Sequence, residues 1–494
     1  MNEMNWVAVL PEIFLLGMAC VIALVDLFVT DPRRTPTYWL TQLTLGVFAA
    51  MHFCAFGEGK VELTMQGMLV SDPMGHLLVA FAAIALAVTL VYARPYAGTR
   101  DLLKGELFTL SLFMLLGVAV MIASANFLMI YLGLELMSLS LYALVALRRD
   151  HALATEAAMK YFVLGALASG FLLYGLSMMY GATGSLDIAQ VFEVVMQGQA
   201  NKGVLILGTV FVVAGLAFKL GAAPFHMWVP DVYHGAPTAA TLLIGGAPKL
   251  AAFGMTIRLL VEGMLGLAVD WQQMLIVLAV ASLVVGNVAA IAQTNLKRML
   301  AYSAIAQMGF MLLGLASGVI NNSTAPALNA YSSAMFYAVT YVLTTLGTFG
   351  LIMLLARQGF ESEQISDLSG LFKRSPWFAL VMAMFMFSLA GIPPTVGFYG
   401  KLAILQAMVG TGSSFYIGLA VVAVLLSLVG AFYYLRVVKV MFFDDATDSN
   451  APVIALDAKV VMSINGIAVV ALGLLPGGLL DLCKQAVMQT LLRN

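Results

Sequence analysis

The chain has 494 residues, of which 62% are hydrophobic and only 10% are charged. Soluble domains average roughly 45–50% apolar and about 25% charged residues, so this composition excludes an ordinary soluble protein. The net charge of -1 gives no sign of a nucleic-acid partner. The three cysteines are far apart and lack metal-ligand spacing, and no GxGxxG motif follows a strand, so we expect no metal or cofactor site on this chain.

Apolar runs recur along the whole chain. A helix needs about 20 apolar residues to cross the hydrocarbon, and the sequence contains fourteen such runs joined by short connections. The first, Trp6–Phe28, is too long for a signal peptide and lacks basic residues before it, so we interpret it as a retained span. We therefore predict an all-α polytopic membrane protein with a single transmembrane domain over residues 1–494. The predicted spans are 6–28, 39–56, 73–93, 106–123, 126–147, 160–180, 204–233, 239–262, 272–292, 299–318, 332–356, 376–409, 416–442 and 458–480.

Basic residues alternate between the two sides of the predicted membrane. Cytoplasmic loops carry an excess of Lys and Arg, so we predict that the odd-numbered loops face the cytoplasm (or the matrix of an organelle) and that both termini face the opposite, outer side. The even-numbered loops contain only Lys60, Lys202 and, at the end of span eight, Arg258. The odd-numbered loops contain Arg33, Arg34, Arg94, Arg100, Lys104, Arg148, Arg149, Lys297, Arg298, Arg357, Lys373, Arg374, Arg436 and Lys439.

Two of the spans are interrupted. Span seven breaks at Pro224 and span twelve breaks at Pro393 and Pro394, because proline removes a backbone donor. The breaks are five spans apart, so the two helices cross the membrane in opposite directions. Matching broken helices in opposed halves indicate an inverted repeat with a site near the midplane. We predict N-terminal spans one to three over residues 1–105, a first five-helix repeat (spans 4–8) over 106–262, a second (spans 9–13) over 272–442, and the last span within 458–494.

Four ionisable side chains lie within the spans. Glu135 is about nine residues into span five, which is near the bilayer centre at 1.5 Å per residue. Lys219 precedes the first break, Lys249 lies in the middle of span eight, and Lys401 follows the second break. Such residues are costly in hydrocarbon and are typical of proton relays. We predict that these four side chains carry protons.

The glutamate and the first lysine form a predicted switch. Burial in a low dielectric makes an ammonium release its proton more easily, and a nearby carboxylate opposes that release. When Glu135 and Lys219 are paired, the lysine holds its proton; when they separate, the proton can pass to Lys249 and then to Lys401. Tyr, Thr and ordered water would bridge the gaps.

Further relay candidates have simpler alternatives. Tyr142 shares a helix face with the span-five glutamate, and His226 and His234 flank the break in span seven. A lone histidine is more often a hydrogen-bonded polar side chain than a relay. Glu156 lies four residues before Lys160, so a plain helical ion pair explains it equally well.

Two motifs carry a family resemblance that covers nearly the whole chain. The runs Lys219–Pro237 and Asn295–Ser303 resemble the signature of the antiporter-like, proton-conducting membrane subunits of respiratory complex I and of Mrp-type cation/proton antiporters. The opening Leu10–Phe14 and a lysine, Lys401, in place of a glutamate in span twelve resemble the complex I branch.

The resemblance implies that this chain is one subunit of a larger complex and that other subunits perform the redox chemistry. Each half would be a five-helix unit with a half-channel, and Glu135, Lys219, Lys249 and Lys401 would match the family's proton-carrying positions. NADH, FMN, the iron–sulfur clusters and quinone would bind in other subunits, and the partners would be antiporter-like neighbours in the membrane arm. An Mrp-type Na⁺/H⁺ antiporter subunit and an assembly scaffold remain as alternatives at this point.

Overall fold

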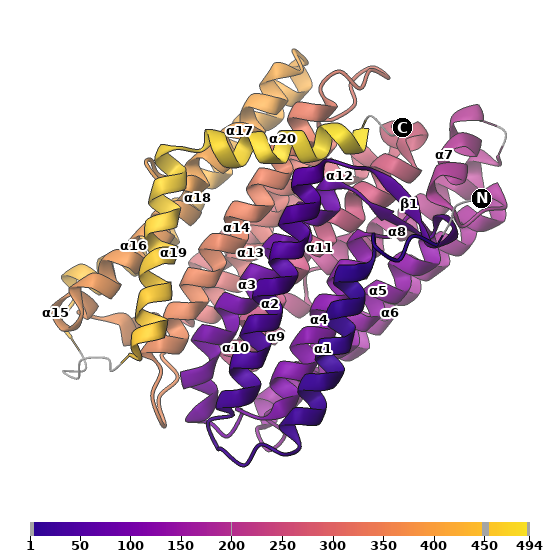
Figure 1. Cartoon of the computed structure of the whole chain (residues 1–494). Coiled ribbons are helices and arrows are strands. Elements are labelled where there is room, and N and C mark those ends of the chain that lie inside the picture. Colours follow the sequence, from indigo (N-terminus) through magenta and orange to yellow (C-terminus); the bar gives the residue numbers. More distant parts are fainter. Residues whose placement is uncertain (1–3, 199, 447–453, 492–494) are drawn as a thin grey trace.

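The computed structural model describes residues 4–198, 200–446 and 454–491, which are almost entirely helical (Figure 1). Twelve helices are long and apolar enough to cross a membrane. With α1 and the broken pair α16–α17 they provide the fourteen predicted crossings. The helices are α1 Leu10–Asp26, α2 Thr35–Glu58, α3 Pro73–Gly98, α4 Gly105–Ile122, α5 Phe127–Val145, α6 Ala152–Thr183, α7 Ile188–Gln197, α8 Lys202–Leu220, α9 Trp228–Gly235, α10 Thr238–Gly245, α11 Ala247–Thr256, α12 Ala268–Ile291, α13 Leu296–Ala316, α14 Ala327–Leu355, α15 Leu371–Arg374, α16 Pro376–Ala390, α17 Val396–Gly410, α18 Ser414–Phe443, α19 Leu456–Leu474 and α20 Gly477–Leu491.

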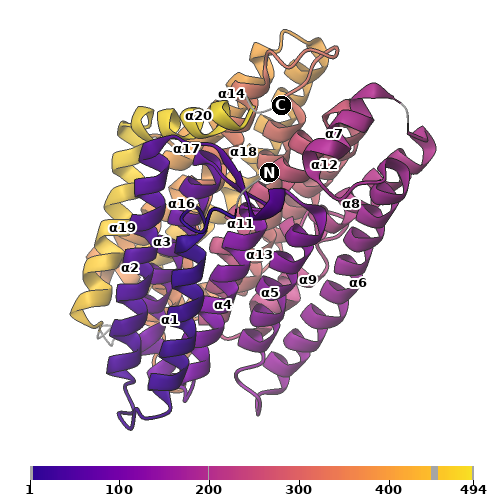
Figure 2. The same cartoon turned by 45° about the vertical axis from the view of Figure 1, so that its right-hand side comes forward.

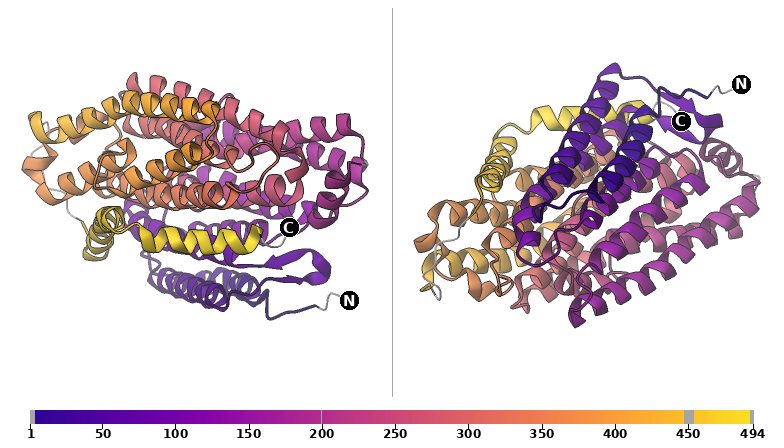
Figure 3. Two further views of the ribbon diagram at one scale, coloured as in Figure 1. Left: turned by 90° about the horizontal axis from the view of Figure 1, so that it is seen from above. Right: turned by 60° about the horizontal axis from the view of Figure 1, so that its bottom comes forward.

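One end of the bundle, which we call the hairpin side, carries a small β-hairpin. Its strands, β1 (Glu62–Thr64) and β2 (Leu69–Ser71), pair antiparallel between α2 and α3. The Val70 amide donates to the Ala123 carbonyl at 2.7 Å, so the hairpin is joined to the connection between α4 and α5. The α1 and α2 helices lie on one flank of the bundle, against α3 and α4 (Figures 2 and 3).

The opposite end, which we call the arginine-rich side, is held by ion pairs between odd-numbered loops. Glu361 accepts from Arg100 Nε at 3.0 Å and from Arg148 Nη1 at 3.3 Å. Burial would raise the pKa of Glu361, but the hydrogen bonds and charge of Arg100 outweigh it and hold that pKa below its usual value. Contacts therefore join odd loops to odd loops, as the fourteen-span arrangement requires.

Two equivalent bridges mark the inverted repeat. In the first half, Asn126 caps α5 and pairs with Asp187; in the second half, Asn295 caps α13 and pairs with Gln364. The first bridge lies on the hairpin side and the second on the arginine-rich side, so the two halves run in opposite directions. The flanking backbone bonds also match: Phe127 N to Leu186 O (2.9 Å) and Ile188 N to Ala125 O (3.0 Å), against Leu296 N to Glu363 O (2.6 Å) and Ile365 N to Thr294 O (3.0 Å).

Two predicted spans differ from the structure. Span eight was predicted as one helix, but it breaks at Gly246 because Pro248 cannot donate to the preceding turn, and it ends in a π-helical turn, Ile257–Gly263. The last span was predicted over 458–480, but it ends at Leu474, just before Pro476.

The final helix, α20, lies across the hairpin side of the bundle instead of continuing the last span (Figures 1 and 3). Its buried face carries Leu479, Cys483, Ala486, Val487 and Thr490, at helical spacing. This face packs on α3 and α14, so α20 is an amphipathic surface helix.

Helices α4 and α5 approach each other closely at Gly133, so we predict that a larger side chain does not fit at this position. A Cβ on Gly133 would lie 2.5 Å from the Met121 amide nitrogen, whereas Gly170 on α6 has open space around its Cα. We expect Gly133→Leu to destabilise the packed chain by about 1–3 kcal/mol or more through overpacking. The measurement is the amount of chain incorporated into membranes and its melting temperature in detergent. Gly170→Leu is the matched control, and equal behaviour of the two variants would contradict the helix contact.

Candidate functional site

The first half of the site joins α5 to the end of α8. Lys219 Nζ donates to Ser138 Oγ at 2.8 Å. Ser138 follows Glu135 by three residues on one face of α5, and Glu135 attracts the Lys219 ammonium electrostatically. Among the described residues these two charges form no direct ion pair, and Glu135 Oε1 is buried without a hydrogen-bond partner. The structure thus places a hydroxyl where the sequence predicts a carboxylate contact.

Lys249 sits at the break in span seven. Its side chain is 2% exposed on α11, and its Nζ donates to Leu220 O at 2.8 Å and lies 3.5 Å from Lys219 O. The ammonium is also 5.8 Å from the centre of the Trp228 ring, within range of a cation–π attraction. Carbonyls released by the helix break therefore hold the lysine.

Lys401 occupies the equivalent place at the break in span twelve. It is 8% exposed, and its Nζ donates to Leu389 O at 2.9 Å, Ala390 O at 3.1 Å and Ser427 Oγ at 2.9 Å. The ammonium lies 5.1 Å from the centre of the Phe310 ring. Two backbone carbonyls and one aromatic face therefore surround each of the two lysines.

The two breaks are built alike. Each first half-helix ends at a glycine in the left-handed region, Gly221 (φ +77°) and Gly391 (φ +85°), and each is followed by a cis X-Pro bond. The amide after each glycine reaches back five residues, Ala222 N to Ala217 O at 2.8 Å and Ile392 N to Phe387 O at 2.9 Å. A helix C-terminus is the negative end of the helix dipole, so it favours a cation.

A polar network continues from the second lysine into the bundle. The Leu389 carbonyl that holds Lys401 also accepts from Gln307 Nε2 at 3.0 Å. The Gln307 side chain is hydrogen-bonded to two tyrosine hydroxyls, Tyr434 at 2.9 Å and Tyr337. These groups connect α16, α13, α18 and α14 around Lys401.

Helix α14 belongs to the second half and contacts α11 of the first half as well as α17 of its own half. Near the first half, the hydroxyl of Tyr233 is fully buried without a hydrogen-bond partner, close to Gly245 on α10. Unpaired buried hydroxyls of this kind accept ordered water. One face of α14 carries hydroxyl side chains that are all buried: Ser333, Tyr337, Thr340, Tyr341, Thr344 and Thr348.

The other candidate relay residues lie in three different settings. Tyr142 OH and His226 Nδ1 are buried without hydrogen-bond partners. His234 is half-buried at the end of α9, beside the ion pairs of the arginine-rich side. Glu156 is exposed and pairs with Lys160 at 2.8 Å, which is the simple helical pair that the sequence left open.

Sequence analysis did not identify Gln307 as a site residue. An alignment of the two repeats would have identified it. Asn126 and Asn295 are equivalent, and Gln307 follows Asn295 by the same number of residues by which Ser138 follows Asn126. Ser138 holds Lys219 in the first half, and Gln307 holds a carbonyl of the second break.

The placement of Arg258 as a loop charge is wrong. Its side chain is fully buried on the π-helical turn after α11. Arg258 Nη2 donates to Asp72 at 2.7 Å, its Nε donates to Ile122 O at 2.9 Å, and its Nη1 is paired with Glu262. The carboxylates and the carbonyl compensate the burial of the charge.

Comparison with known proteins identifies the family of this chain. Residues 124–427 match the family model described as NADH:quinone oxidoreductase/Mrp antiporter, TM. The chain is 63% identical to "NADH-quinone oxidoreductase subunit N" of Polaromonas naphthalenivorans, over 98% of each chain. It is 60% identical to the protein of the same name from Herminiimonas arsenicoxydans, over 99% of this chain and 100% of that one. The chain belongs to the subunit N family of NADH–quinone oxidoreductases.

Solved structures agree with this assignment. A chain of respiratory complex I from Thermus thermophilus with bound aureothin has a TM-score of 0.80 and 30% identity, over 95% of this chain and 98% of that chain. A chain of the Mrp complex from Dietzia sp. has a TM-score of 0.85 but 20% identity, over 99% and 98% of the two chains. The second likeness shows a shared fold, whereas the subunit N relatives define the family.

Lys401 packs closely against Gly391 at the second break, so we predict that adding a methyl group at Gly391 displaces the lysine. A Cβ on Gly391 would lie 2.9 Å from Lys401 Cδ and 3.3 Å from its Nζ; Gly412, with φ +69°, has open space. Both substitutions by alanine incur backbone strain of about 1 kcal/mol, but only Gly391→Ala should also move the ammonium off its carbonyls.

The check is a structure of each variant, with the melting temperature of the purified protein. Gly391→Ala should show Lys401 displaced from Leu389 O and a lower melting temperature than Gly412→Ala. An unmoved ammonium in Gly391→Ala would contradict the tight fit.

Proposed function

We propose that this chain translocates protons as a membrane-arm subunit of NADH–quinone oxidoreductase, and that Glu135, Lys219, Lys249 and Lys401 carry them. The observation that supports this most strongly is the pair of helix breaks that each hold a buried ammonium on released carbonyls. Packing alone does not require such an arrangement, because an apolar side chain would fill the same place without a buried charge.

Lys249 is the next carrier after Lys219 in this proposal. Its ammonium lies 3.5 Å from the backbone carbonyl of Lys219 and 2.8 Å from that of Leu220, so it stands at the break that ends the Lys219 helix. The Lys219 ammonium is bound to Ser138 on α5, so ordered water would carry the proton between the two lysines.

Glu135 and Ser138 control the first lysine. In the structure Ser138 holds the Lys219 ammonium, and Glu135 contributes its negative charge from one helical turn away. A shift of α5 relative to α8 that brings Glu135 Oε1 onto Lys219 Nζ would fix the proton on the lysine. The reverse shift would release it toward Lys249.

The second half would pass the proton on through neutral groups and one lysine. Gln307 and the hydroxyls of Tyr337 and Tyr434 reach the carbonyl that holds Lys401. Ordered water between Tyr233 and these groups would complete the path, since a bridging water is nearly as good as a direct hydrogen bond.

Electron transfer belongs to other subunits in this proposal. NADH, FMN, the iron–sulfur clusters and quinone would act elsewhere in the complex, and conformational or electrostatic change in the membrane arm would reach this chain through antiporter-like neighbours. The arginine-rich side would face the cytoplasm and both termini the periplasm of a bacterial inner membrane.

Removing a carrier should reduce proton transport in the assembled complex. Glu135→Gln and Lys219→Met keep the side-chain size and remove the charge. We expect each to lower NADH-driven proton uptake into proteoliposomes at least about ten-fold, equivalent to a barrier higher by about 1.4 kcal/mol. Uptake is normalised to complex assembly, measured as NADH oxidation by a soluble electron acceptor.

Exposed charges of the same types provide the matched controls. Glu156→Gln and Lys104→Met remove a carboxylate and an ammonium from exposed ion pairs and should leave proton uptake within about two-fold of the unmodified complex, because exposed pairs contribute little. Full proton uptake in Glu135→Gln or Lys219→Met would rule out the carrier role.

A further inference from the structure

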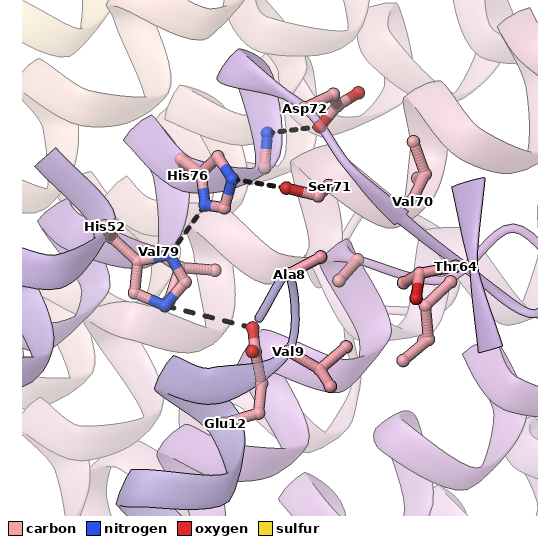
Figure 4. A pocket seen from close by; sticks show the side chains of 13 residues that line it. Ala8, Val9, Glu12, His52, Thr64, Val70, Ser71, Asp72, His76 and Val79 are labelled. Carbon is pink, nitrogen blue, oxygen red and sulfur yellow. Dashed lines mark hydrogen bonds and ion pairs between the residues drawn. The ribbon is translucent and has the colours of Figure 1, made fainter. Parts of the chain in front are cut away.

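A second cluster of buried ionisable groups lies in the first three spans, apart from the glutamate and lysines of the two repeats. It joins Glu12 on α1, His52 on α2, Ser71 on β2 and His76 on α3 (Figure 4). His52 Nδ1 lies 2.9 Å from His76 Nδ1, and His76 Nε2 lies 2.8 Å from Ser71 Oγ. His52 Nε2 is 3.9 Å from Glu12 Oε1.

The contact between the two Nδ1 atoms allows only two arrangements of the protons on the neutral rings. A hydrogen bond between two ring nitrogens needs a proton on one and a lone pair on the other. If His52 Nδ1 carries the proton, neutral His76 carries its own on Nε2, facing Ser71. If His76 Nδ1 carries it, neutral His52 carries its own on Nε2, facing Glu12. The pair therefore has two neutral states that differ by one proton at each end.

The two rings are the buried centre of the cluster. His52 is 1% exposed and His76 is 6% exposed, whereas the Glu12 side chain is 14% exposed. At the Glu12 end, His52 Nε2 and Glu12 Oε2 are buried without hydrogen-bond partners. At the outer end, Ser71 and His76 also line an open hollow on the hairpin side, whose other polar residues are Asn5, Glu58, Lys60 and Glu62.

Charged and hydrogen-bonding side chains from several elements surround the histidine pair. Asp72 caps α3 through the Gly75 amide at 2.9 Å and is itself bound by the buried Arg258. Thr490 of α20 lies 3.4 Å from the second oxygen of Asp72. The charged groups around the histidine pair are Glu12 from α1, Glu58 from α2, Asp72 before α3 and Arg258 after α11.

We propose that Glu12, His52, His76 and Ser71 form a proton relay between Glu12 on α1 and the hollow on the hairpin side. Imidazole is the side chain suited to a proton shuttle. This relay shares no residue with the Glu135–Lys401 line; because proton uptake by the complex is coupled to its turnover, blocking either path slows the whole uptake. Its nearest link to that line is Arg258, on the segment that follows the Lys249 helix.

One passage moves one proton. The Glu12 carboxyl gives its proton to His52 Nε2, closing the 3.9 Å gap by a small side-chain movement, and becomes a carboxylate. His52, now an imidazolium, gives its Nδ1 proton to His76 Nδ1. His76 releases its Nε2 proton to Ser71 or water in the hollow. Both rings are then neutral in the opposite tautomer. Before a second passage, the Glu12 carboxylate takes up a proton from water at its partly exposed edge, and the rings turn so that a protonated nitrogen of His52 again faces His76.

The test replaces each ring by an amide that keeps the hydrogen bond but cannot carry the charge. We expect His52→Asn and His76→Asn each to slow NADH-driven proton uptake into proteoliposomes at least about five-fold at unchanged complex assembly. Because the loss of either ring already interrupts proton transfer along the relay, the double variant should be no slower than either single variant. Glu12→Gln, which removes the proton donor at the other end of the relay, should reach the same residual rate.

His151→Gln is the control, because His151 lies in the loop before α6 at the opposite end of the bundle. It should leave uptake unchanged. Unchanged uptake in His52→Asn or Glu12→Gln, or single losses that multiply in the double variant, would overturn the relay. If a histidine variant does not assemble, the Glu12→Gln result decides. Failure of the Glu135 and Lys219 variants to affect uptake would refute only the other line.

Discussion

The structure depends on how an ammonium group is accommodated in hydrocarbon. An intact helix has no free carbonyl to offer, so a lysine within it would carry a large desolvation cost. Breaking the helix releases its last carbonyls inside the membrane, and in both repeats these carbonyls accept from a buried lysine. The break and the lysine therefore form one unit in each repeat.

The two halves share this unit but supply its charge differently. Lys249 reaches the carbonyls of residues 219 and 220 from the neighbouring span, whereas Lys401 reaches those of residues 389 and 390 from the second half of the same broken span. The acceptors are equivalent by the repeat, and the donors are not. This difference concentrates charge near the first break and leaves neutral hydroxyls and an amide around the second.

Much of the architecture could be predicted because hydrocarbon imposes simple rules on sequence. Apolar run length gave the fourteen spans, loop charges gave the alternation of sides, and the prolines gave both breaks that hold lysines. Local chain chemistry explains what was missed: the break at Gly246 depends on where Pro248 falls in its helix, and Pro476 turns α20 onto the surface. Pairwise contacts between distant segments, such as Lys219 with Ser138 or Arg258 with Asp72, have no signal in single-sequence periodicity.

The central claim is that a hydrated line of polar groups joins the lysines at the two breaks. A structure of the assembled complex at a resolution that shows ordered water tests it most directly. The account predicts waters bridging Lys249 to Tyr233 and onward past the polar face of α14 to Gln307 and Lys401. A continuous apolar barrier between Lys249 and Gln307, with no ordered water across it, would contradict the account.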